Sequence, residues 1–216
     1  MKRETNTQWL VSVALMAAIV ILLANTPLGM IQLPIIKATT VHIPVIIGAI
    51  LLGPAAGAIL GGVFGLCSLI SNTQAPTLLS FAFSPFLSTT GLVGAVKALW
   101  ISIGCRVMIG LLSGLLWKAL RNVKVKNMRF ALLAVTGFFG SMVNTVFVMG
   151  SIYLLFAKQY AEVKNVGMEA VFGLVMGTVT ASGIPEAIAA AVLVSVITTA
   201  LLGTGFVKKL YYASAA

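Results

Sequence analysis

One arginine, Arg106, lies well inside an apolar stretch of this chain, and its chemistry needs a partner. It falls about eight residues after the start of an expected membrane helix, which is roughly 12 Å into that helix. A guanidinium at that depth is costly unless it is paired. Two interpretations stay open: Arg106 binds a substrate carboxylate with its planar set of donors, or it pairs structurally with Glu186 or reaches toward the membrane surface.

Other polar side chains occur where apolar stretches begin and end. Each has a second, structural interpretation: His42 bonded to backbone at the interface, Lys97 as a helix-end anchor, Trp100 as an interfacial residue, and Asn144 as a helix-packing contact. The expected ligand-binding residues are Arg106, Lys97, Asn72, Gln74, Lys37, His42, Asn144 and Trp100.

The sequence lacks the residues that catalysis or a metal site would need. One histidine, four acidic residues and no aspartate supply neither a metal cluster nor a Ser-His-Asp triad, and no Walker lysine motif is present. We therefore expect no catalytic residue, no metal and no cofactor, and any ATP hydrolysis must belong to another subunit. The two cysteines, Cys67 and Cys105, are expected to be buried free thiols.

The composition indicates an all-α integral membrane protein. Hydrophobic residues make up 60% of the 216, charged residues make up only 8%, and the mean hydropathy is +1.10. The apolar runs are long and continuous, which favours helices over barrel strands. We expect one domain, residues 1–216, whose six transmembrane helices cover residues 9–24, 42–53, 54–71, 98–120, 130–156 and 185–206.

The basic residues indicate how these helices are oriented. The net charge of +10 needs no nucleic acid as a partner, because the basic residues cluster at helix ends. With both termini in the cytoplasm, six helices and a Gly53-Pro54 turn place nine basic residues inside: Lys2, Arg3, Lys118, Arg121, Lys124, Lys126, Arg129, Lys208 and Lys209. A single long helix across residues 43–70 would instead put the 121–129 cluster outside.

The irregular stretches then all fall on the outer side, which predicts a ligand pocket under the outer loops. They are residues 25–41, 72–97 and 157–184. Residues 168–181 are apolar but short and are followed by Ser-Gly-Ile-Pro, so we expect a short outer or re-entrant helix there. Pro76, Pro85, Gly91 and Gly94 are expected to interrupt any long helix in the 72–97 loop.

One stretch resembles a known family. Residues 37–65, KATTVHIPVIIGAILLGPAAGAILGGVFG, followed by SLISNT at 68–73, resemble the substrate-binding S components of energy-coupling factor (ECF) vitamin transporters, most of all the pantothenate-specific type. The length and the six helices are also similar. The specific motif covers residues 38–73, and the match after Gly140 is general.

The resemblance implies a multi-pass protein of the bacterial cytoplasmic membrane that binds a vitamin from outside. It also implies partners, namely a transmembrane T component and two ABC-type ATPases. The family's Ala-x-x-x-Ala contact for the T component is matched by Ala14 and Ala18. Folate, riboflavin or a pyridoxine-like vitamin would use the same scaffold, so the cargo stays open. A small channel is a weaker alternative, because no continuous polar stripe runs along several helices. The acid-poor composition argues against an enzyme.

Overall fold

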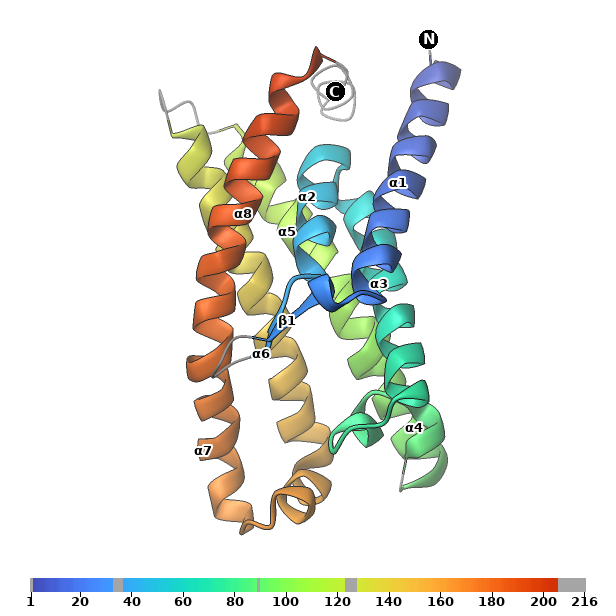
Figure 1. Ribbon diagram of the computed structural model, residues 1–216, viewed down its shortest axis with the longest axis vertical. Coiled ribbons are helices and arrows are strands. Elements are labelled where there is room, and N and C mark those ends of the chain that lie inside the picture. The colour runs from blue at the N-terminus through green and yellow to red at the C-terminus, as the bar shows by residue number, and fades with distance from the viewer. Residues whose placement is uncertain (1, 33–36, 89, 123–127, 206–216) are drawn as a thin grey trace.

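The protein is a bundle of long helices crossed by one small β-hairpin (Figure 1). This computed structural model describes all residues except 1, 33–36, 89, 123–127 and 206–216. The main helices are α1 (Lys2–Ala24), α2 (His42–Leu52), α3 (Pro54–Gln74), α4 (Gly91–Leu99), α5 (Cys105–Leu120), α6 (Arg129–Lys164), α7 (Met168–Thr178) and α8 (Ile184–Gly203). The strands are β1 (Met30–Gln32) and β2 (Lys37–Thr39), and short 3-10 turns lie at Pro27–Gly29 (η1), Ser80–Ala82 (η2) and Pro85–Leu87 (η3).

Two π-helical turns join helices that the sequence pattern separates. The turn η4 (Trp100–Gly104) connects α4 to α5, and η5 (Val179–Gly183) connects α7 to α8. Residues 168–203 therefore form one continuous helical unit, visible along one side of Figure 1, in place of the expected short outer or re-entrant helix followed by a separate span. The wider turn of η5 accommodates Pro185, which has no backbone N–H to donate. In the 72–97 stretch, Gly91 begins α4, and Gly94, which was expected to interrupt a long helix, lies inside it.

The expected turn between the second and third helices is present at Gly53. This residue has φ +95°, a backbone conformation that glycine adopts readily, and Pro54 follows as the first residue of α3. Trp9 of α1 donates its indole N–H to the carbonyl of Leu52 at 3.0 Å, which ties α1 to the end of α2. The hairpin of α2 and α3 is thus closed without a polar loop.

The β-hairpin lies part-way along the bundle instead of at its end (Figure 1). Its strands are antiparallel with Met30 opposite Thr39 and Gln32 opposite Lys37. The helix that follows, α2, has 11 residues and so is only about 16 Å long. Because α2 runs back from the hairpin to the Gly53 turn, its short length sets the hairpin deep within the bundle.

Close backbone contact between α3 and α5 fixes the helix that carries Arg106. A Cβ atom at Gly61 would overlap the backbone carbonyl of Arg106, and one at Gly57 would overlap the carbonyl of Gly110. These glycines therefore permit the approach of the two helices. Gly65, one turn further along α3, lies equally close to the backbone of Ser102 and Ile103, so the three glycines form one packing face.

The buried apolar residues form two separate clusters. The first joins α1, α2, α3, α5, α6 and α8 around residues such as Ile46, Leu60 and Leu133. The second joins the α4–α5 unit, α6 and α7 around Phe81, Phe156 and Val171. The bundle therefore has two apolar cores, and α5 and α6 contribute residues to both.

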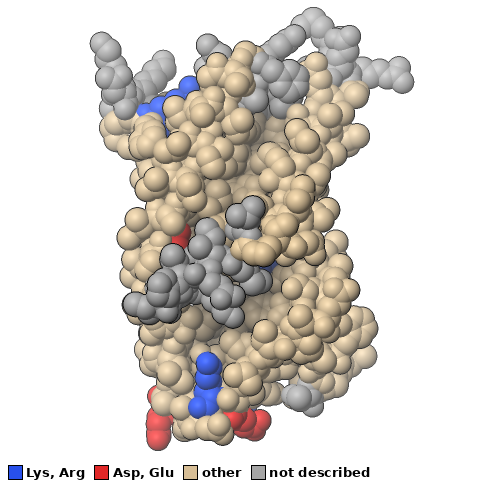
Figure 2. Space-filling model, in the orientation of Figure 1, with Lys and Arg blue, Asp and Glu red and all other residues tan. Residues whose placement is uncertain are grey.

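The exterior is that of a membrane protein. Five helical segments among the described residues are long and apolar enough to cross a membrane, namely Thr7–Ala24, Pro54–Gln74, Gly91–Leu120, Arg129–Lys164 and Met168–Gly203, while His42–Leu52 is shorter. On the face in Figure 2, the described charged side chains gather mainly at the two ends of the molecule. The helical class and the multi-pass membrane architecture expected from the sequence are confirmed.

Candidate ligand-binding site

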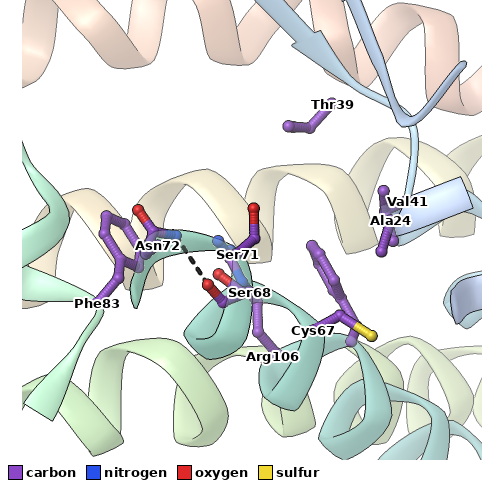
Figure 3. A pocket seen from close by; sticks show the side chains of 10 residues that line it. Ala24, Thr39, Val41, Cys67, Ser68, Ser71, Asn72, Phe83 and Arg106 are labelled. Carbon is purple, nitrogen blue, oxygen red and sulfur yellow. Dashed lines mark hydrogen bonds between the residues drawn. The ribbon is translucent and has the colours of Figure 1, made fainter. Parts of the chain in front are cut away.

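A cavity of about 120 Å³ lies between the β-hairpin and the helices α3 and α5 (Figure 3). Its polar lining consists of Thr39, Ser68, Ser71, Asn72 and Arg106. Its apolar lining consists of Ala24, Val41, Phe64, Phe83 and the thiol residue Cys67. A small apolar chamber with a few polar groups that converge on it is the usual form of a ligand site.

The α3 wall of the cavity follows from helical spacing. Phe64 precedes Ser68 by four residues, and Ser71 and Asn72 follow Ser68 by three and four, so all of them lie near one face of α3. Figure 3 shows Thr39 on the side opposite these serines. Asn72 is among the ligand-binding residues expected from the sequence, but Phe64, Ser68 and Ser71 are not. Their regular spacing within an apolar run was the signal that could have identified them.

Arg106 supplies the positive charge of the cavity. It is the second residue of α5, directly after the π-helical turn, and only 9% of it is exposed. Its Nη1 donates a hydrogen bond to Oδ1 of Asn144 on α6, and its guanidinium carbon lies 4.8 Å from the ring centre of Phe64 and 5.9 Å from that of Phe83. Its Nε is buried and has no hydrogen-bond partner among the described residues.

No ion pair joins Arg106 to Glu186, although both residues are described. Glu186 accepts two hydrogen bonds from Thr39 instead: the backbone N–H lies 3.3 Å from Oε1, and the hydroxyl Oγ1 lies 3.1 Å from Oε2. The structural pairing considered from the sequence is therefore not formed. Arg106 remains a buried cation whose described partners are an amide oxygen and two aromatic faces. A buried charge in that state favours an anionic ligand that completes its hydrogen bonds.

The comparison with known families agrees with this architecture. Residues 8–198 match the family described as "ECF transporter, substrate-specific component". The chain belongs to this family. Within the curated proteins, it is similar to the pantothenic acid transporter PanT of Lactococcus lactis subsp. cremoris, with 38% identity over 124 residues. That alignment spans 57% of this chain and 60% of the relative.

In this ECF substrate-specific component, Asn72 supports the wall of the site through both ends of its amide. Its Nδ2 donates to the carbonyl of Ser68 at 2.8 Å, and its Oδ1 accepts from the hydroxyl of Ser80 at 2.9 Å. The second bond holds residues 75–88, which we call the Phe83 segment, against α3. Because Phe83 belongs to the same segment, Asn72 also positions an aromatic wall of the cavity.

Lys97 and Trp100 lie outside the cavity lining. The Lys97 ammonium donates to the carbonyl of Leu155 at 3.2 Å and lies 5.8 Å from the ring centre of Phe156. Phe156 interrupts α6 with φ −135° and ψ 24°, so Lys97 binds a carbonyl next to a kink. The indole N–H of Trp100 donates to Ser151 at 3.2 Å.

The remaining expected site residues are divided between the neighbourhood of the cavity and the surface. Asn144 reaches Arg106 but does not line the cavity. His42 is buried at the start of α2, next to Val41, and neither of its ring nitrogens has a described hydrogen-bond partner. Gln74 is exposed at the end of α3. The side chain of Lys37 lies outside the described part of the chain.

Proposed function

We propose that this ECF substrate-specific component captures pantothenate from outside the cell for import. The observation that carries the proposal is the incompletely bonded guanidinium of Arg106 beside the cavity. Pantothenate offers a carboxylate to Arg106, hydroxyls and an amide to the α3 serines and Asn72, and a dimethyl group to Phe64 or Phe83. The partial match to a pantothenic acid transporter supports the same cargo.

The cavity is small for this cargo. Its volume of about 120 Å³ is below the roughly 300 Å³ at which pockets for drug-sized ligands begin. We therefore expect the cavity walls to move apart when the vitamin binds. The β-hairpin and the Phe83 segment are the walls that do not belong to the long helices, so they are the parts we expect to shift.

The membrane arrangement that we propose has six crossings in the bacterial cytoplasmic membrane. Five are the long helical segments, and α2 is the short sixth, which begins at the β-hairpin in the interior and ends at the Gly53 turn. We place the start of α1 and the end of α8 on the cytoplasmic side, because they lie at the same end of the bundle as the end of α5 and the start of α6, which carry Lys118 and Arg129 (Figure 1). The cavity then opens toward the outside.

The energy for import is proposed to come from partner subunits. Family membership supports a transmembrane T component and two ATPases as those partners. Ala14 and Ala18 are exposed on α1, four residues apart on one face, which suits close contact with a helix of the T component. On this proposal the isolated chain binds its cargo but neither transports it nor hydrolyses ATP.

Native mass spectrometry of the protein as isolated tests the cargo. We expect a bound species heavier by the mass of pantothenate, and saturable binding of added pantothenate by calorimetry. A panel of folate, riboflavin and a pyridoxine-like vitamin decides between cargoes on the same scaffold. Tight binding of one of these vitamins together with no binding of pantothenate would identify that vitamin as the cargo. Ion or solute conduction without saturable binding would favour the channel.

A further inference from the structure

Of the acidic side chains that the structure describes, Glu186 alone is buried, with 9% of it exposed. It lies in the first turn of α8, directly after the π-helical turn η5. Such turns insert a residue and change the direction in which the next side chains point, and they are frequent at functional sites. Arg106 also follows a π-helical turn, η4, so both buried charged groups have this local geometry.

The carboxyl group of Glu186 is used to hold the hairpin. Both of its oxygens accept hydrogen bonds from Thr39, one from the backbone N–H and one from the hydroxyl, across 147 residues of sequence. Thr39 is also a lining residue of the cavity. The same residue therefore connects the wall of the cavity to α8.

The hairpin needs such an anchor. Its two strands contribute three facing residue pairs, and an isolated two-stranded hairpin is at best marginally stable. Strand β2 leads through Thr40 into Val41, which also lines the cavity. An attachment at Thr39 thus fixes the position of two successive parts of the cavity wall.

We propose that Glu186 is a positioning residue of the ligand site, which holds Thr39 and the adjoining wall in place and thereby sets how fast molecules enter and leave the cavity. The role in vitamin exchange rests on the proposed function. The role of Glu186 in holding the cavity wall, which we call the mechanical part, does not rest on the proposed function, because it does not depend on the identity of the cargo.

A ligand-free experiment tests the mechanical part. Cys67 lines the cavity, so its rate of reaction with a water-soluble maleimide in the Cys105→Ser background reports access to that space. We expect Glu186→Ala to raise this rate about tenfold or more, because two hydrogen bonds to a carboxyl group are lost. Glu186→Gln and Thr39→Ser, which each keep most of the bonding groups, should react at close to the parent rate.

Three controls separate this effect from general loosening. Glu169→Ala removes an exposed acid of the same helical unit and should leave the rate unchanged. Buried Cys105, followed in the Cys67→Ser background, should stay unreactive in the Glu186→Ala variant. Thr39→Val should raise Cys67 labelling, and the double variant should add little to Glu186→Ala alone.

Equal labelling of Cys67 in the parent protein, Glu186→Ala and Thr39→Val would overturn the proposal, as would a matching rise at Cys105. With radiolabelled pantothenate, we expect Glu186→Ala to speed dissociation about tenfold. An unchanged dissociation rate would refute the role in exchange. A parent protein that binds no pantothenate would refute the proposed cargo, while the labelling rates would still decide the role of Glu186.

Discussion

At the scale of single residues, the charge balance of the interior identifies the ligand chemistry. Arg106 is buried against Asn144, Phe64 and Phe83, while the nearest candidate counter-charge, Glu186, is engaged by Thr39. Removing one partner of a buried charged contact costs roughly 2–5 kcal/mol, so a ligand carboxylate that meets Arg106 should dominate the affinity. A neutral vitamin such as riboflavin has no carboxylate to pair with Arg106.

The first prediction compares pantothenate with pantothenol, its analogue in which the carboxylate is a primary alcohol. We expect pantothenol to bind at least about thirtyfold more weakly, because the alcohol leaves the guanidinium uncompensated. Calorimetry on the protein and on Arg106→Gln measures both affinities. The variant should bind pantothenate weakly and lose most of the preference, whereas an undiminished preference in Arg106→Gln would assign the carboxylate to another residue.

Lys97 leads to a second prediction, in which stability and affinity separate. Its ammonium bonds the carbonyl of Leu155 beside the kink at Phe156, away from the cavity lining. Lys97→Met should cost about 1 kcal/mol and lower the melting temperature by roughly 2–4 °C. Pantothenate affinity should stay within about twofold. A loss of affinity comparable with that of Arg106→Gln would instead place the ammonium in the ligand site.

At the scale of elements, the sequence predicted the α2–α3 turn because glycine followed by proline has a direct conformational meaning there. The same two residue types gave wrong expectations at Gly94 and Pro185, which both lie inside continuous helical units. A π-helical turn depends on which carbonyl each N–H reaches, and hydropathy does not record that choice. The depth of the β-hairpin could not be predicted from the sequence either, because it follows from the short length of α2 within the assembled bundle.

The candidate site was predictable only in part for a related reason. Arg106 stood out because a charge in an apolar run is rare, and Asn144 because it is polar at a similar depth. Thr39 and Glu186 are 147 residues apart, so their contact arises only when the hairpin packs on α8. Lys97 had the right charge for a carboxylate but lies near the kink of α6.

The third prediction uses the glycine contact between α3 and α5. Gly61→Ala would push a methyl group into the backbone of Arg106 and Val107, where no flexible side chain can yield. We expect a loss of about 1–3 kcal/mol in stability together with weaker pantothenate binding, because the helix that carries Arg106 must shift. Thermal unfolding and calorimetry measure the two effects.

The neighbouring glycine provides a matched control for this prediction. A Cβ atom at Gly62 would meet only the side chain of Val107, at the ordinary contact distance of 3.8 Å. Gly62→Ala should therefore leave stability and affinity close to those of the parent protein. Equal effects at both positions would mean that helix propensity, and not the close approach of α3 and α5, governs the response.

At the scale of the whole molecule, the two apolar clusters explain how a polar site is kept inside a membrane bundle. The first cluster surrounds α2, and the second joins the α4–α5 unit to α6 and α7. The cavity touches both clusters, since its lining residues Val41 and Phe64 belong to the first and Phe83 packs against the second. Each core can thus hold its helices together while the wall segments adjust to a ligand.

The direction in which the cavity opens depends on the orientation of the bundle, which the fourth prediction tests. In a background with Cys67 and Cys105 replaced, single cysteines at Lys118 and Glu162 would occupy exposed positions at opposite ends of the bundle. The excess of basic residues near Lys118 indicates that this end faces the cytoplasm. A membrane-impermeant maleimide added to intact cells should therefore label Glu162→Cys and spare Lys118→Cys until the cells are opened. The reverse pattern would turn the cavity toward the cytoplasm, and a protein so oriented could not collect a vitamin from outside.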